Sequence, residues 1–236
     1  MRTLGLIGGM SWVSTAHYYR ALNEGVAARR GGLHSAPLLL HSLDFAPIAA
    51  AQAAGDWDAL AAQLGASARA LAGAGAQGLL LATNTMHRVA EAVQAAAGPD
   101  VPLLHIADAT GAALQAAGVG RAALLGTRFT MEDGAIVADR LRQRFGLEVR
   151  VPEADERALV HRVIYEELCH DRAVPASRAA YLALIDRMQQ RGAEAVILGC
   201  TEIGMLVDAS NSPLPVFDST ALHAAAALDW MLDDPP

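Results

Sequence analysis

Around its second cysteine the chain reads Val196-Ile197-Leu198-Gly199-Cys200-Thr201-Glu202-Ile203, an apolar run that stops at a glycine, presents a thiol and then turns polar. An apolar tetrad that ends in Gly-Cys predicts a buried parallel strand with Cys200 at its carboxyl end. In open α/β sheets, ligands bind at that edge. The stretch therefore predicts an α/β fold with a thiol at the place where chemistry occurs.

The residues after Cys200 are compatible with the start of a helix. A thiol at a helix N-terminus is close to the positive end of the helix dipole, which lowers its pKa from about 8.5 and favours the thiolate. A thiolate is a usable base or nucleophile. The alternative is that Cys200 is a small buried hydrophobic residue, which is the usual role of a free cysteine.

Composition limits the class of protein. The chain has 236 residues, of which 53% are hydrophobic, so it can bury the core of one large α/β unit or of two small domains. Two cysteines, Cys169 and Cys200, are too few for a disulfide framework, and Met1–Gly5 leads into a strand without a signal-peptide pattern, so we expect a cytoplasmic protein. No apolar stretch is long enough to cross a membrane. The net charge of −7 argues against a nucleic-acid partner but not against a small anionic ligand.

Alternating strand and helix signals fill the first part of the chain. A strand at residues 4–7 breaks at Gly8-Gly9, which lacks the full dinucleotide-binding pattern and instead suggests close approach of the backbone to a small ligand. The other predicted strands in this part are residues 37–42, 78–82 and 102–106, and the predicted helices are residues 16–28, 58–74 and 109–117.

The same pattern then repeats. Strands are predicted at residues 121–125, 147–151 and 195–198, and helices at residues 175–191 and 219–230. Thr83 lies 75 residues after Gly8 (8 to 83), and Cys200 lies 74 residues after Gly126 (126 to 200). We infer a duplication into two similar, pseudo-symmetric α/β lobes, each a short parallel sheet flanked by helices, with the active site in the cleft between them. The predicted boundaries are residues 1–107 plus 218–236 for the first lobe and 108–217 for the second.

In such a pair, Thr83 and Cys200 would approach a shared ligand from opposite sides. Two proton-handling groups on opposite faces of one carbon suit removal of a proton from one face and its return to the other, as in racemisation.

The motifs that carry these residues resemble the aspartate/glutamate racemase family. They are Gly8-Gly9-Met10-Ser11-Trp12, Thr83-Asn84-Thr85-Met86-His87, Gly126-Thr127 and Gly199-Cys200-Thr201-Glu202. The resemblance covers essentially the whole chain. It implies an enzyme that uses no pyridoxal phosphate or other cofactor, in which each lobe contributes one catalytic residue, usually a cysteine.

This chain departs from that family in two ways. Thr83 stands where the first cysteine is expected, and a hydroxyl is a poor base although it can return a proton to a carbanion. The resemblance to a Thr/Cys branch implies preference for the L-enantiomer, with Cys200 abstracting the α-proton. Arylmalonate decarboxylases also keep only the second cysteine, so one thiol does not prove racemisation. No arginine occurs in Asp44–Ile48, where many aspartate racemases carry one for the substrate carboxylate.

Further site residues follow from the resemblance. We expect contacts to substrate from Met10, Gln52, Asn84, Thr85, Thr127 and Thr201. Asn84, Thr85, Thr127 and Thr201 can also be read as turn and capping residues, and Gln52 as an exposed helix residue.

His87, Glu202 and Cys169 carry less specific signals. His87 could tune the charge of the site or be a capping or core histidine. Glu202 would disfavour a thiolate unless it points away from Cys200. Cys169 is read as a packing residue.

The sequence thus predicts a cofactor-independent racemase of aspartate or glutamate, with Cys200 and Thr83 as the catalytic pair, no metal and no membrane or nucleic-acid partner. A homodimer is left open. The alternatives are a decarboxylase or cis-trans isomerase of a small dicarboxylate on the same fold, and an amino-acid-binding protein without catalysis.

Overall fold

The computed structural model describes residues 1–233 and divides into two compact units. The first unit contains Met1–His105 together with the end of the chain from His223, and the second unit contains Ile106–Leu222. Each unit has a four-stranded parallel sheet, with strand order β2-β1-β3-β4 in the first and β6-β5-β7-β8 in the second. The predicted fold class, two similar α/β lobes with short parallel sheets flanked by helices, is confirmed.

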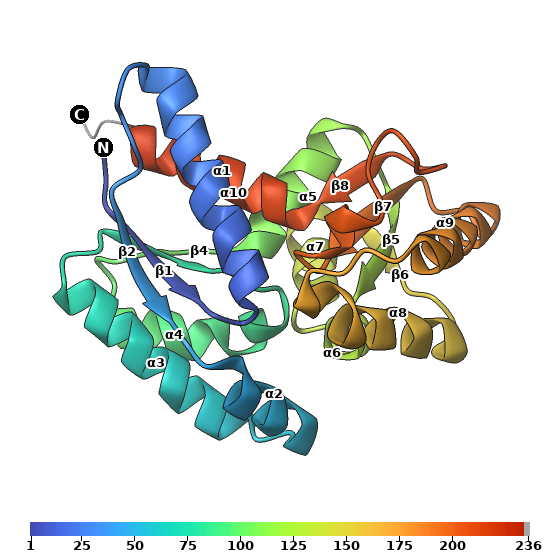
Figure 1. The fold of residues 1–236 in the computed structure, drawn as a ribbon, viewed down its shortest axis with the longest axis horizontal. Helices are drawn as coiled ribbons and strands as arrows, with labels where there is room; N and C mark the ends of the chain where they lie inside the picture. Colours follow the sequence, from blue (N-terminus) through green and yellow to red (C-terminus); the bar gives the residue numbers. More distant parts are fainter. Residues whose placement is uncertain (234–236) are drawn as a thin grey trace. The chain divides into compact units, whose positions relative to one another are not determined.

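In the first unit, each of the first three strands is followed by one or two helices (Figure 1). Its strands are β1 (Leu4–Gly8), β2 (Leu38–Ser42), β3 (Gly78–Leu81) and β4 (Leu103–Leu104). Its helices are α1 (Trp12–Arg30), α2 (Phe45–Ala54), α3 (Trp57–Gly73), α4 (Ala90–Ala97) and most of α10 (Ser219–Leu232).

Both faces of the first sheet are covered because successive side chains of a strand point to opposite faces. Leu4 and Leu6 of β1 pack with α1 and α10, whereas Ile7 of the same strand packs with α3 and α4. These apolar layers leave only the strand ends open to polar residues.

The second unit repeats this order. Its strands are β5 (Arg121–Gly126), β6 (Glu148–Arg150), β7 (Ala195–Gly199) and β8 (Val216–Asp218). Its helices are α5 (Ile106–Ala116), α6 (Arg128–Glu132), α7 (Ala138–Phe145), α8 (Ala154–Glu166) and α9 (Pro175–Gln190). Val196 and Leu198 of β7 pack with α8 and α9, and Ala195 and Ile197 pack with α5 and α7.

One predicted strand is much shorter than expected. The pattern at residues 102–106 predicts five strand residues, but only Leu103–Leu104 pair with β3, and Ile106 is already the first residue of α5. The Ile106 carbonyl accepts the Thr110 hydroxyl within that helix. A short apolar run fits a strand or a helix start equally well, which explains the error.

Among residues 1–233, no helix combines the length and the apolar composition that a membrane crossing requires.

Candidate active site

In the first unit, the predicted site residues gather at the carboxyl edge of the sheet. Ile7 of β1 pairs with Leu81 of β3, so the loops that follow these strands start side by side. The amide of Ala82 donates to the carbonyl of Ile7, which continues this pairing to the residue before Thr83. Five buried residues predicted from the sequence belong to this unit: Met10, Gln52, Thr83, Asn84 and Thr85.

Thr83 is fixed through its backbone by a histidine. His87 Nδ1 lies 2.8 Å from the carbonyl oxygen of Thr83, and because a carbonyl only accepts, this nitrogen carries the proton. Both residues are buried, and His87 belongs to the 3-10 turn Thr85–Val89 that begins two residues after Thr83. His87 is therefore a core residue that holds the Thr83 loop, which agrees with the core alternative.

The ring of His87 is surrounded by two further histidines. The ring of His87 is 4.6 Å from that of His105 and 5.7 Å from that of His223. His223 Nε2 donates to the carbonyl of Leu104, so its Nδ1 accepts the Tyr18 hydroxyl at 2.9 Å. Burial lowers the pKa of His223 to about 4; burial and the two neighbouring histidines hold the pKa of His87 well below its usual value. His87, which holds the backbone of Thr83, and His223 are therefore neutral at neutral pH.

Gln52 is a buried residue of α2 and not an exposed helix residue. Its Nε2 donates to the sulfur of Met86 at 3.0 Å, which connects α2 to the turn after Thr83. Because the Gln52 amide is buried next to Met86, Gln52 lies at the same edge of the sheet as Thr83. The sequence alone also allowed an exposed position for this residue.

Gly8 and Gly9 serve internal packing, contrary to the prediction that they leave room for a ligand. A Cβ on Gly8 would lie 2.6 Å from the Thr15 side chain, and a Cβ on Gly9 would lie 2.1 Å from the carbonyl oxygen of Leu43. Gly9 also has φ +86°, which favours glycine. The space that these glycines provide is occupied by the protein itself.

In the second unit, the thiol and its neighbours follow two strands that lie very close together. Gly126 of β5 pairs with Gly199 of β7, and a Cβ on Gly126 would lie 2.8 Å from the carbonyl oxygen of Gly199. The next residues are Thr127 on one strand and Cys200 on the other, and both are buried. The two glycines therefore bring the predicted residues Thr127, Cys200 and Thr201 to one edge.

The thiol is protonated and hydrogen-bonded to a carboxylate. Cys200 Sγ donates to Glu202 Oε2 at 3.0 Å, and the Thr201 hydroxyl donates to the same oxygen at 2.5 Å. Burial raises the pKa of Cys200 well above its usual value, and the Glu202 charge raises it further. Glu202 thus points toward the thiol and disfavours the thiolate.

The prediction that a helix dipole lowers the thiol pKa is wrong. Cys200 is followed by a 3-10 turn, Ile203–Met205, of only three residues, which has no appreciable dipole. The backbone N–H of Glu202 does favour the thiolate, but burial and the carboxylate outweigh it.

Thr127 and Cys169 have structural contacts of their own. The Thr127 side chain accepts the amide of Thr130 at 3.2 Å and so caps α6, which supports the capping interpretation. Cys169 packs against the core of the second unit, and burial raises its pKa to about 12.

No cluster of three or more His, Cys, Asp or Glu side chains arranged to hold a metal ion is found in residues 1–233.

The chain is similar to known proteins along almost its whole length. The sequence pattern of the family described as Asp/Glu/hydantoin racemase matches residues 7–227. The structure of an Asp/Glu racemase candidate from Yersinia pestis is 48% identical, with TM-score 0.90 over 99% of this chain and 100% of that one. An aspartate racemase homologue from Pyrococcus horikoshii is 30% identical, with TM-score 0.82 over 98% and 99% of the two chains. The glutamate racemase of Francisella tularensis, solved with D-glutamate, shares the fold at 12% identity, with TM-score 0.66 over 100% and 84%.

Proposed function

Because the chain belongs to the Asp/Glu/hydantoin racemase family, we propose that it is a cofactor-independent racemase of aspartate or glutamate in which Cys200 removes the α-proton of the L-enantiomer. Thr83 acts on the opposite face of the α-carbon. The observation that carries the proposal is the Cys200–Glu202 hydrogen bond of 3.0 Å, which gives the thiol proton a place to go. D-Glutamate bound to the Francisella glutamate racemase supports an acidic amino acid as the substrate class.

The proton steps balance as follows. Glu202 accepts the proton of the Cys200 thiol, and the resulting thiolate takes the α-proton of the substrate to leave a carbanion. The Thr83 hydroxyl then gives its proton to the other face of the carbanion, which is a far stronger base than an alkoxide, and the Thr83 alkoxide regains a proton from water. The hydroxide that this step leaves takes up the proton held by Glu202, which restores the carboxylate. The product is the D-enantiomer, with the α-proton held on Cys200.

The two units support these roles separately. The Glu202 carboxylate beside Cys200 can accept the thiol proton, so Cys200 is the residue that takes the α-proton from the substrate. The histidine that contacts Thr83 is neutral and donates to its backbone carbonyl, so the Thr83 hydroxyl suits proton donation better than proton abstraction. Met10, Gln52, Asn84, Thr85, Thr127 and Thr201 are proposed to hold the α-carboxylate and amino groups.

One sequence fact supports chemistry without pyridoxal phosphate. The chain contains no lysine, so no side chain can form the Schiff base that holds this cofactor. The cytoplasmic location expected from the cysteine content is part of the same proposal.

The test is α-proton exchange in deuterated water. L-Aspartate and L-glutamate are incubated with the protein, and the α-proton signal and the optical rotation are followed together. We expect both signals to decay, and we expect Cys200→Ala to abolish the decay while substrate affinity stays within about tenfold. Exchange that persists in Cys200→Ala would contradict the assignment, and binding without exchange in the wild type would favour an amino-acid-binding protein.

A decarboxylase is the second candidate, because a protonated Cys200 is the donor that a carbanion left by loss of carbon dioxide requires. Release of carbon dioxide from a substituted malonate, without exchange of aspartate, would favour this alternative.

A further inference from the structure

Three side chains outside the predicted site lie at the same edge of the second unit as Cys200. Arg128 and Thr201 each stand two residues beyond the paired glycines Gly126 and Gly199, and neighbouring strands are about 4.8 Å apart. The backbone N–H of Arg128 donates to His161 Nδ1 at 3.2 Å. His161 of α8 is therefore held at the edge where the thiol lies.

This contact also sets the orientation of His161. Since Nδ1 accepts an N–H, the proton of the neutral ring is on Nε2, on the side of the ring away from the Arg128 backbone. The ring is packed between Phe129, with centroids 5.8 Å apart, and Tyr165, with centroids 4.6 Å apart. His161 thus presents a fixed N–H donor while remaining half-buried.

Tyr165 connects this pair to the thiol. It lies one helical turn after His161 on the same face of α8 and packs against the core cluster that contains Cys200. Burial raises its pKa, and the neighbouring Cys169, Cys200 and Glu202 raise it further. The phenol therefore remains a hydroxyl donor next to the thiol and its carboxylate.

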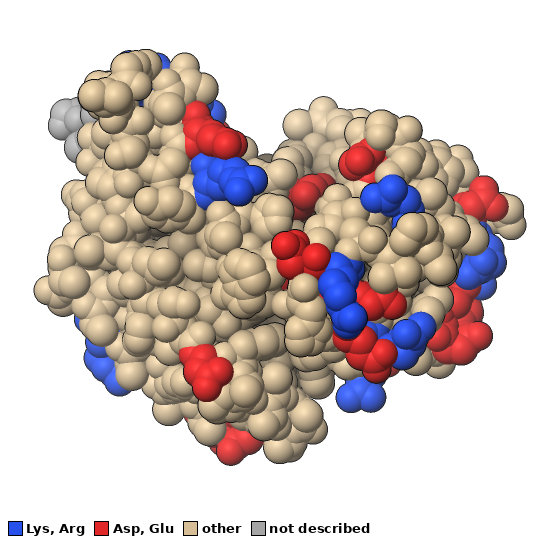
Figure 2. Space-filling model, viewed as in Figure 1, with Lys and Arg blue, Asp and Glu red and all other residues tan. Residues whose placement is uncertain are grey.

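Arg128 supplies the positive charge of this group. Its side chain is exposed, its guanidinium lies 5.6 Å from the ring centroid of Phe129, and it forms no ion pair within residues 1–233. Most other charged side chains on α8 and α9 are mixed in sign, as the alternating colours in Figure 2 show. They also form ion pairs, such as the 2.6 Å contact between Arg187 and Glu156.

The charged groups around His161 are few. Burial lowers the pKa of His161, the Arg128 charge lowers it further, and Glu132, which is itself paired with Arg157, opposes this change. The remaining titratable neighbour is Tyr165. The group Arg128–His161–Tyr165 thus offers one cation and two neutral donors. Of the two carboxylates near it, Glu132 is paired with Arg157, and Glu202 accepts hydrogen bonds from Cys200 and Thr201.

We propose that Arg128, His161 and Tyr165 bind the side-chain carboxylate of the acidic amino acid, an inference that rests on the proposed function. An acidic amino acid carries a second carboxylate, and a planar guanidinium with nearby N–H and O–H donors is suited to receive it. The group thereby determines specificity for acidic over neutral substrates.

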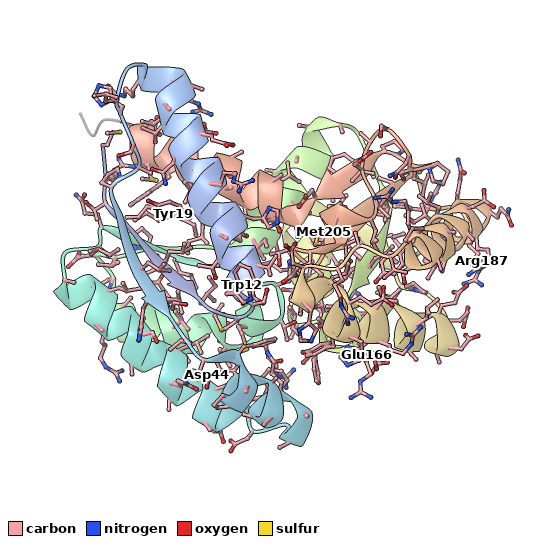
Figure 3. The ribbon with its side chains drawn as sticks, in the orientation of Figure 1. Trp12, Tyr19, Asp44, Glu166, Arg187 and Met205 are labelled. Carbon is pink, nitrogen blue, oxygen red and sulfur yellow. The ribbon has the colours of Figure 1, made fainter. Side chains whose placement is uncertain are left out.

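The test compares Arg128→Gln with a matched control, Arg162→Gln. Arg162 is the next residue after His161, is also exposed, and pairs with the exposed Glu166 of α8, which Figure 3 labels. Its substitution therefore removes the same charge outside the group. Affinities for L-aspartate, L-glutamate and L-asparagine are measured by calorimetry, and α-proton exchange is measured in parallel. Arg128→Lys tests whether a charge without the guanidinium geometry restores binding.

We expect Arg128→Gln to weaken L-aspartate binding at least tenfold and to raise KM by the same factor, with kcat within about threefold. L-Asparagine binding changes less than twofold, Arg128→Lys restores affinity in part, and Arg162→Gln behaves as wild type.

The outcomes separate this proposal from the proposed function. A wild type that binds L-aspartate without α-proton exchange refutes the racemase activity alone, and the affinities of the variants still decide this proposal. Equal weakening of L-aspartate and L-asparagine in Arg128→Gln, no weakening, or no binding of either acidic amino acid by the wild type would overturn it.

Discussion

Replacing Glu202 with glutamine should lower the pKa of Cys200 and yet reduce catalysis. The thiol sulfur is 3.0 Å from Glu202 Oε2, so ionising the thiol places two negative charges in contact. Two unit charges at about 4 Å interact by roughly 1 kcal/mol in water and roughly 4 kcal/mol at an effective dielectric constant of 20. At about 1.36 kcal/mol per pH unit, removal of the carboxylate lowers the thiol pKa by about one to three units.

The substitution isolates the charge. Glutamine has nearly the shape of glutamate, so no cavity forms around this buried side chain, and the backbone N–H of residue 202 that favours the thiolate is kept. The assay is the pH dependence of alkylation of Cys200 by iodoacetamide, followed by mass spectrometry. Cys169→Ala is used as the background, although with its pKa at about 12 Cys169 reacts little in the range of the assay.

Catalysis should move in the opposite direction from thiolate formation. Glutamine cannot accept the thiol proton, so we expect α-proton exchange of L-aspartate to fall on the order of a hundredfold at pH 7, within the range typical of a lost acid–base group. An unchanged or raised thiol pKa would refute the electrostatic reasoning. Faster exchange in Glu202→Gln would mean that the carboxylate restrains the thiol and does not accept its proton.

Three further outcomes are expected. Thr83→Cys supplies a second thiol and should raise the rate of α-proton exchange of D-aspartate about tenfold or more. The measurement compares the solvent-exchange rates of the two enantiomers, and equal rates already in the wild type would contradict the role given to Thr83. Gly199→Ala places a Cβ 3.0 Å from a backbone carbonyl oxygen and should cost about 1–3 kcal/mol in urea unfolding, whereas Gly73→Ala, with nothing within 4 Å, should not destabilise the protein. Burial lowers the pKa of His223 from 6.5 to about 4, so the unfolded chain binds this proton first as the pH falls. The free energy of unfolding should therefore decrease by about 3 kcal/mol between pH 6.5 and pH 4. His223→Gln should flatten this pH dependence, and an unchanged slope in that variant would argue against the assignment to His223.

The sequence is sufficient for the fold because its pattern is local and repeated. Apolar runs that end in glycine predict strands such as β7, and the spacing from Gly8 to Thr83 recurs from Gly126 to Cys200. Strand ends and helix starts are less certain, since an apolar residue such as Ile106 fits both. The short β4 and the 3-10 turn after Cys200 are errors of this kind.

The site is only partly predictable for a different reason. Sequence motifs find residues that follow strand ends, such as Cys200, but they do not give the direction of a side chain. The Glu202 carboxylate could point toward or away from the thiol, and only its 3.0 Å contact decides that the resting thiol is protonated. Arg128 and His161 are 33 residues apart, and it is the backbone contact between the loop after β5 and α8 that brings them together.

The two units use one topology to build opposite electrostatic surroundings. Cys200 has a buried carboxylate in contact, whereas the hydrogen-bonded partner at Thr83 is a neutral histidine on the backbone. A thiol placed at residue 83 would therefore ionise without a neighbouring carboxylate to accept its proton. For this reason the gain from Thr83→Cys should stay below the activity that Cys200 provides on the L-enantiomer, and the preference for one enantiomer depends on the second layer of residues as well as on the difference between a hydroxyl and a thiol.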